Sequence, residues 1–390
     1  MRRFLPLVVL AAACRGEAPR TPSGADADAR FAALVDTLSP AVEKSVGLSF
    51  REPPRSAVRS REQVRRYLEA KLDEELPPER LHGIETAYRL FGLIADSIEL
   101  RPLMLDLLTE QVVGFYDPDS ATLFGVSGAP PDQLRIMAAH EMVHALQGQY
   151  LPLDSILDQR GSNDRATAAQ AVLEGQAMVA SIGAVTGSDA LADPGIWALF
   201  REQARNAQQS MPRFAAAPLI VREALIFPYI EGAEFMRWWA SSPHADTMPY
   251  GPRMPESTEQ ILHPDRYAAG DRPLEIAFAP SSSRVLHEDA LGELEIRILG
   301  AILNRNDEVS YTVPLGWAGD RYRVTATPDG PALEWLVAFD DVRTRERFAT
   351  GPGARLAATR REGYTALLTP TEVRGKPGLQ YLLTPTSRRE

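Results

Sequence analysis

Residues 137–150, MAAHEMVHALQGQY, decide how the rest of the chain is interpreted. The stretch places His140 and His144 four residues apart, with Glu141 directly after the first histidine. On a helix, residues four apart lie on one face, so both imidazoles can reach one ion about 2.0–2.1 Å from each nitrogen. Glu141 lies at the edge of that face, where its carboxylate can take a proton from water that the metal activates. The alternative is a buried helix whose histidines are satisfied by hydrogen bonds.

A catalytic zinc site of this kind needs a third protein ligand. Glu174 is the candidate, because it is the only charged residue in the apolar stretch AAQAVLEGQAMVASIGAV, residues 168–185. A lone buried carboxylate is costly unless a cation faces it, and a metal would supply that cation. Gly175 would let a second helix approach closely. The alternative is a glutamate in a polar network without metal, in which case Glu231 and Glu234 are the next candidate ligands. Two imidazoles and a carboxylate suit zinc, and we expect one zinc per chain.

A donor to the oxyanion that forms during attack on a carbonyl is also expected. Tyr229, in the stretch LIFPYIEGAEFMRWW at residues 225–239, is the first candidate. A buried tyrosine bonded to backbone is the alternative for this residue. His263, Tyr267, Arg266 and His244 lie in the following loop-rich stretch and rank after Tyr229.

The expected fold class is α+β. Apolar spacing of three and four predicts helices from Phe31 to about Glu110. Residues 112–128 then read as two short strands around a turn. Two buried helices follow, one from Pro131 to about Gln149 and one that ends at Gly187. A hairpin on Pro-Asp-Gly at 328–330, a short helix and a further strand pair are expected near the C-terminus.

These patterns divide the chain into six segments. We expect a signal peptide at 1–13, a lipid anchor and flexible tether at 14–30, a helical layer at 31–110, the zinc-binding catalytic core at 111–250, a loop-rich connector at 251–270 and an α+β domain at 271–390. No motif is recognisable in the C-terminal third.

The N-terminus favours export. Arg2 and Arg3 precede a short apolar run, and Ala11-Ala12-Ala13-Cys14 resembles the processing site of bacterial lipoproteins. We therefore expect a protein held on a membrane of the bacterial cell envelope through a lipid on Cys14; a plain cleaved signal is the alternative. Cys14 is the only cysteine, so disulfides and thiol catalysis are excluded. With a net charge of −10 and no Lys/Arg block, nucleic acid is not an expected partner.

Three motifs together resemble the gluzincins, zinc peptidases with an H-E-x-x-H helix and a glutamate on a following helix. The first is His140 to His144, the second Glu174-Gly175-Gln176-Ala177, and the third Pro228-Tyr229-Ile230-Glu231-Gly232. The last two are similar to the E-G-x-A and P-Y-x-x-G stretches of aminopeptidase-N-like enzymes, where the tyrosine is catalytic. Residues 114–126 stand where such enzymes carry the strand that pairs with substrate. The motifs cover about residues 111–240, and the whole chain is similar to uncharacterised bacterial lipoproteins of the H-E-x-x-H type.

The chain departs from that group in two respects. Twenty-nine residues (145–173) separate His144 from Glu174, more than is usual, and we assign the excess to a loop insertion at YLPLDSILDQRGSN, residues 150–163. The G-x-M-E-N sequence with which aminopeptidases hold a free amine is absent. This absence favours cleavage inside a peptide over removal of its first residue.

The resemblance implies an exported, lipid-anchored zinc metallopeptidase that acts on a peptide or protein. His140, His144 and Glu174 would hold zinc, Glu141 would act as general base and later as proton donor, and Tyr229 would stabilise the oxyanion. Two rivals remain. One is a zinc amidase on cell-wall peptides, and the other is a non-catalytic binding or assembly lipoprotein that keeps a metal for stability.

Overall fold

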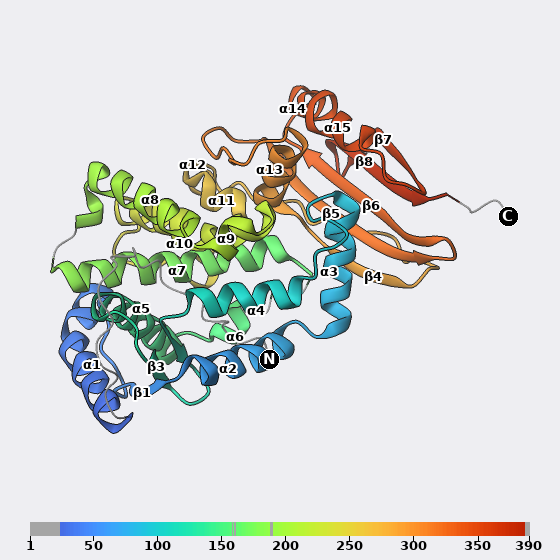
Figure 1. Ribbon diagram of the computed structural model, residues 1–390. Coiled ribbons are helices and arrows are strands. Elements are labelled where there is room, and N and C mark those ends of the chain that lie inside the picture. Colours follow the sequence, from blue (N-terminus) through green and yellow to red (C-terminus); the bar gives the residue numbers. More distant parts are fainter. Residues whose placement is uncertain (1–23, 158, 160, 188–189, 387–390) are drawn as a thin grey trace.

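The computed structural model describes residues 24–157, 159, 161–187 and 190–386 (Figure 1). Helix makes up 56% and strand 17%, which confirms the α+β class. The expected signal peptide, the lipidated Cys14 and the first part of the tether lie outside the described residues. Within the described residues, no helix is long and apolar enough to cross a membrane.

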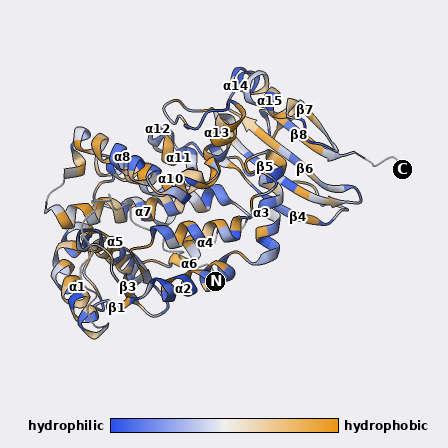
Figure 2. Ribbon diagram, in the orientation of Figure 1, coloured by the Kyte–Doolittle hydropathy of each residue, from blue (hydrophilic) through white to orange (hydrophobic). Residues whose placement is uncertain are grey.

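The N-terminal region differs from the expectation at two points. Helix α1 spans Gly24–Val46, so the tether prediction was wrong for residues 24–30. A strand, β1 at Arg55–Arg59, interrupts the region expected to be wholly helical. Three helices follow: α2 Arg61–Glu75, α3 Pro78–Phe91 and α4 Leu100–Gln111. Helix α2 is mostly hydrophilic (Figure 2) and turns a stripe of Val64, Leu68 and Leu72 into the core.

The two predicted strands of the central region are confirmed as β2, Gly114–Asp117, and β3, Thr122–Val126. They pair antiparallel, while β1 pairs parallel with β3, giving the order β1-β3-β2. This small sheet packs against α5, Pro131–Tyr150, because Gly114 leaves room for the Met137 side chain. The sheet and the helix that carries His140 therefore form one unit.

The second buried helix, α7, spans Asn163–Thr186 and ends at Gly187, whose φ of 69° is left-handed, as predicted. Between α5 and α7 the expected insertion contains a short helix, α6, Leu153–Leu157. The chain continues through η1 Ala190–Ala192, α8 Pro194–Gln209, α9 Pro212–Ala216 and α10 Leu219–Ala240. A Cβ added to Gly175 would overlap the backbone of Gly232 in α10, which confirms that Gly175 permits a close approach of two helices.

Helix α7 lies at the centre of the molecule (Figure 1), and buried apolar residues cover it on two sides. One cluster joins Ala177, Ala180 and Ala184 of α7 to α1, α5 and β2. The other joins Ala168, Ala171 and Val172 to α2, α3, α4, α10 and the C-terminal region. The buried apolar side chains of α7 therefore face either the small sheet or the rest of the core.

The C-terminal region begins with short helical segments and ends in a sheet. The helical segments are η2 Gly251–Arg253, α11 Thr258–Leu262 and α12 Pro264–Ala268. The sheet has the antiparallel order β4-β5-β6-β8-β7, from β4 Val285–Asp289, β5 Trp317–Thr327, β6 Gly330–Phe339, β7 Tyr364–Val373 and β8 Lys376–Pro385. Its helices are α13 Gly292–Leu303, α14 Val342–Phe348, η3 Ala349–Gly353 and α15 Ala354–Ala358. The predicted hairpin, short helix and strand pair are confirmed.

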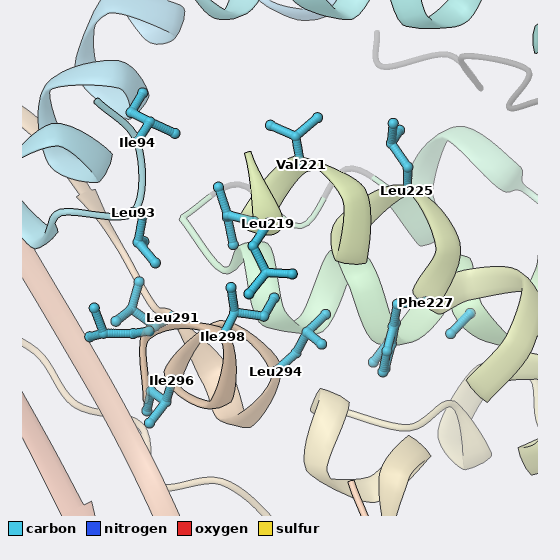
Figure 3. Packing of buried hydrophobic residues seen from close by; sticks show 14 of the residues in the cluster. Leu93, Ile94, Leu219, Val221, Leu225, Phe227, Leu291, Leu294, Ile296 and Ile298 are labelled. Atoms are coloured by element: carbon cyan, nitrogen blue, oxygen red, sulfur yellow. The ribbon is translucent and has the colours of Figure 1, made fainter. Parts of the chain in front are cut away.

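Helix α13 connects this region to α10. Leu294, Ile296 and Ile298 of α13 lie in the same apolar cluster as Leu219, Leu225 and Phe227 of α10 (Figure 3). The buried core is therefore continuous across residues 251–270, and the domain boundary there stays a prediction.

Candidate metal centre

Helices α5 and α7 bring the three predicted ligands together. His140 Nε2 lies 3.1 Å and His144 Nε2 3.2 Å from the same oxygen, Oε2 of Glu174, and the two nitrogens lie 3.1 Å apart. The side chains of His140 and Glu174 are wholly buried, and His144 is 5% exposed. These three residues form a buried group that can hold a metal ion.

The spacing of the three donor atoms fits such an ion. Donors around a tetrahedral zinc with bonds of about 2.0–2.1 Å lie about 3.3–3.4 Å apart. The observed triangle is only slightly smaller, and Oε1 of Glu174 has no hydrogen-bond partner within the described residues. A cation at the centre of the triangle would satisfy three converging lone pairs that otherwise face one another.

A buried glutamine determines which nitrogen of His144 is free to bind. The amide nitrogen of Gln147 donates to the Leu173 carbonyl at 3.0 Å, and a carbonyl can only accept. The amide oxygen of Gln147 is therefore the atom 2.8 Å from Nδ1 of His144. Nδ1 must donate to it, which leaves the lone pair on Nε2, the atom that faces Glu174.

The sequence analysis missed this glutamine and the residues behind it. Gln147 also donates to Oε1 of Gln176 at 2.9 Å, and the Tyr250 hydroxyl donates to the same oxygen. Met248 Sδ accepts from the Gln176 amide at 3.5 Å. The available signal was the position of Gln147 one turn after His144 on an otherwise apolar helix. No corresponding partner holds Nδ1 of His140 within the described residues.

Glu141 lies beside the triangle and is 1% exposed. Its Oε2 accepts a hydrogen bond of 2.9 Å from the Tyr116 amide of β2, whereas Oε1 has no hydrogen-bond partner among the described residues. Burial raises the pKa of Glu141 to about 7, although the neighbouring His144 and the Tyr116 amide favour the charged form. One carboxylate oxygen is thus fixed by the sheet, and the other can accept a proton.

The ligands themselves are electrostatically coupled. Burial disfavours the charged forms of both, but the attraction between Glu174 and His144 outweighs it. The pKa of Glu174 falls to about 2, and that of His144 rises to about 9. Burial lowers the pKa of His140, with the Glu174 carboxylate opposing that shift. Without a metal, the Glu174 carboxylate is therefore paired with a protonated His144, and a metal ion that bound there would take the place of that proton.

Tyr229 of α10 completes the cluster. Its side chain is 1% exposed, and its ring stacks on that of His140 with centroids 5.9 Å apart. Burial and the nearby carboxylates of Glu174 and Glu141 raise its pKa well above the ordinary value, and it hydrogen-bonds Glu174. The tyrosine identified from the sequence thus lies against the ligands.

The other candidates from the sequence have different partners. His263 lies 3.1 Å from Glu293, and the Tyr267 hydroxyl donates to the Arg253 carbonyl at 2.8 Å. The remaining candidates are likewise engaged elsewhere: Arg266 by Asp271 and Asp340, His244 by the ring of Trp239, Glu231 by Arg201 and Arg205, and Glu234 by Arg237.

No family model and no curated protein matches the chain. The crystal structure of a proposed hydrolase with a novel fold from Chloroflexus aurantiacus is similar over 66% of this chain and 94% of that one. The identity is 18% and the TM-score 0.43.

Proposed function

We propose that the chain is a zinc metallopeptidase that cleaves bonds within peptides. The observation that carries the proposal is the convergence of His140, His144 and Glu174 on one point. Glu141 lies beside them, and its Oε1 has no hydrogen-bond partner among the described residues. Zinc is the metal of choice for two imidazoles and a carboxylate. The resemblance of the three motifs to the gluzincins supports the same assignment.

The residues around the site then divide the steps of peptide hydrolysis among them. Zinc, when bound, supplies Lewis acidity that activates water and polarises a carbonyl at neutral pH. Oε2 of Glu141 is held by the Tyr116 amide, so Oε1 takes the proton from the attacking water. The same oxygen later returns a proton to the leaving amine. The Tyr229 hydroxyl, already aimed at the ligands, donates a hydrogen bond to the developing oxyanion.

One observation favours a second candidate function. The metal group is almost entirely buried, as a purely structural metal site in a non-catalytic lipoprotein would be. Glu141 argues for the peptidase, because a structural site has no use for a base with an unpartnered oxygen.

The decisive experiment is the Glu141→Gln variant. The amide keeps the shape of the side chain but cannot accept a proton, so turnover on any cleaved peptide should fall by about 10²–10⁴-fold. Zinc content, measured by elemental analysis, should stay at one per chain. A peptide hydroxamate should bind zinc in the wild type, which a closed structural site would not allow. Near-normal turnover in Glu141→Gln would end the peptidase proposal.

We further propose that the enzyme is exported and held on a membrane of the cell envelope through a lipid on Cys14. The support is the lipoprotein-like sequence before Cys14. Cys14→Ser should release the protein from the membrane fraction or leave the precursor unprocessed. Processed, membrane-bound protein in that variant would contradict the anchor.

A further inference from the structure

A largely apolar pocket lies between the N-terminal halves of α7 and α10, and α2, α3, α4 and α13 supply its other walls. Its volume is about 340 Å³. Aliphatic side chains form most of its surface, among them Leu72, Leu76, Ile84, Met104, Val221 and Leu225. An apolar cavity of about 150 Å³ already binds benzene, so this pocket has room for a large side chain.

The pocket lies one helical turn from the metal centre. Gln170 of α7 and Leu225 of α10 line it, and Glu174 and Tyr229 follow four residues later on the same helices. Four residues make about one turn, or roughly 5.4 Å, on one helix face. Gln170 is partly exposed whereas Glu174 is wholly buried. The pocket is therefore accessible from solvent beside Gln170, and Glu174 lies buried one turn further along the same helix.

The side chains of α10 extend from two sides of the helix. Val221 and Leu225 extend from one side of α10, toward the pocket, while Phe227 extends from the other into the core with α13 (Figure 3). Val221 and Leu225 thus belong to the packed core and at the same time form part of the pocket wall.

Four polar residues of the lining are already engaged. Oε1 of Glu295 accepts hydrogen bonds from the Tyr88 hydroxyl at 2.6 Å and from Asn163 at 2.8 Å. Burial raises the pKa of Glu295 well above its ordinary value. Arg101 pairs with Asp73 at 2.7 Å. Because most of the lining is apolar, a charged ligand group would pay for its lost hydration, so the pocket suits an uncharged one.

We propose that this pocket receives an aliphatic or aromatic side chain of the peptide substrate, at the second or third residue from the cleaved bond. The proposal rests on the peptidase function and names its substrate preference. An extended peptide advances about 3.3 Å per residue, so one turn of helix corresponds to about two residues. The pocket thereby selects peptides with large apolar residues near the bond.

Ala224→Trp tests the proposal, because Ala224 is exposed at the pocket wall. The indole of the introduced tryptophan would fill the pocket without disturbing the core. Ala240→Trp, on an exposed position about 24 Å along the same helix, is the matched control. The substrates are ten-residue peptides that carry Leu, Ala or Asp at one position at a time. The ratio of kcat/KM for Leu over Ala should fall at least tenfold in Ala224→Trp and keep its wild-type value in the control. Ala166→Phe, which fills the pocket from α7, should give the same shift.

Binding separates this proposal from the peptidase function. Fluorescence anisotropy with labelled Leu and Ala peptides is measured on the Glu141→Gln protein and on its double variant with Ala224→Trp. Tighter binding of the Leu peptide than of the Ala peptide, lost in the double variant, supports the pocket proposal. This result would still support the pocket if the wild type cleaved none of the peptides, in which case only the peptidase proposal would fail. Cleavage with an equal Leu/Ala ratio in wild type and Ala224→Trp overturns the pocket alone. Tight binding of myristic acid that Ala224→Trp abolishes, without any peptide preference, assigns the pocket to a lipid and also overturns it.

Discussion

The chain buries two histidine–glutamate clusters and balances their charge in different ways. At the interface of α11 and α13, Oε1 of Glu293 lies 3.1 Å from Nε2 of His263. The same oxygen accepts hydrogen bonds from Nε of Arg297 at 2.7 Å and from the Leu315 amide at 3.0 Å. Between α5 and α7, Glu174 receives two imidazoles and a tyrosine. Within the described residues, Glu174 forms no ion pair with an arginine or a lysine.

The two clusters differ in the source of the positive charge that balances the buried carboxylate. A buried carboxylate is stable when a cation is paired with it and its oxygens are hydrogen-bonded. The Glu293 cluster contains its own cation in Arg297. The Glu174 cluster contains no arginine or lysine within the described residues, so its positive partner is either a protonated His144 or a bound metal ion.

The sharpest way to break this comparison is to remove each carboxylate in turn. Glu174→Ala, like His140→Ala or His144→Ala, should abolish stoichiometric zinc, measured by elemental analysis. Glu293→Ala should keep zinc at one per chain but destabilise the protein by about 3–5 kcal/mol, because it leaves Arg297 buried and unpaired. Denaturant unfolding measures the second effect. The comparison fails if Glu174→Ala retains full zinc, or if folded Glu293→Ala loses it.

The tyrosine gives the next largest effect. Tyr229→Phe removes one hydroxyl from the ligand cluster, and turnover should fall by about 10²–10³-fold, or roughly 3–4 kcal/mol, with KM nearly unchanged. Zinc should remain bound. Tyr267→Phe is the control, because that hydroxyl bonds the Arg253 carbonyl. Equal turnover in the two variants would remove Tyr229 from the mechanism.

The smallest effect concerns the orientation of His144. Gln147→Leu removes the acceptor that fixes the proton on Nδ1, and zinc affinity should weaken by about 10–100-fold. Competition with a chelator of known affinity measures this change. Gln149→Leu is the control on the same helix, because Gln149 bonds the backbone around Glu52 instead. An unchanged zinc affinity in Gln147→Leu would show that the helix alone orients His144.

Local signals explain what the sequence could predict. His140 and His144 share a face by helical spacing alone, and Glu174 is conspicuous as one charge in a long apolar helix. The turn between β2 and β3 and the helix end at Gly187 are likewise determined by residues close to them in the sequence. Each of these features requires no knowledge of a distant partner.

The missed features depend on contacts between distant segments. Strand β1, RSAVR, has little apolar alternation and becomes a strand through pairing with β3 some 67 residues later, Arg55 opposite Thr122. The amides of Gln147 and Gln176 meet only because α5 and α7 cross, and Tyr250 reaches them from a loop. The sequence pattern within one segment cannot predict such contacts between distant segments.

The contact between Gly175 and Gly232 has a consequence for motion. Each glycine lies where any side chain would overlap backbone of the facing helix, so α7 and α10 cannot slide past each other without a clash. Glu174 precedes Gly175 directly, and Tyr229 lies three residues before Gly232. Ligand and tyrosine therefore travel as one rigid body. Under the proposed peptidase function, a peptide would reach the buried centre through movement of the surrounding parts, α5 with its small sheet or the segment around Tyr250, relative to that fixed pair.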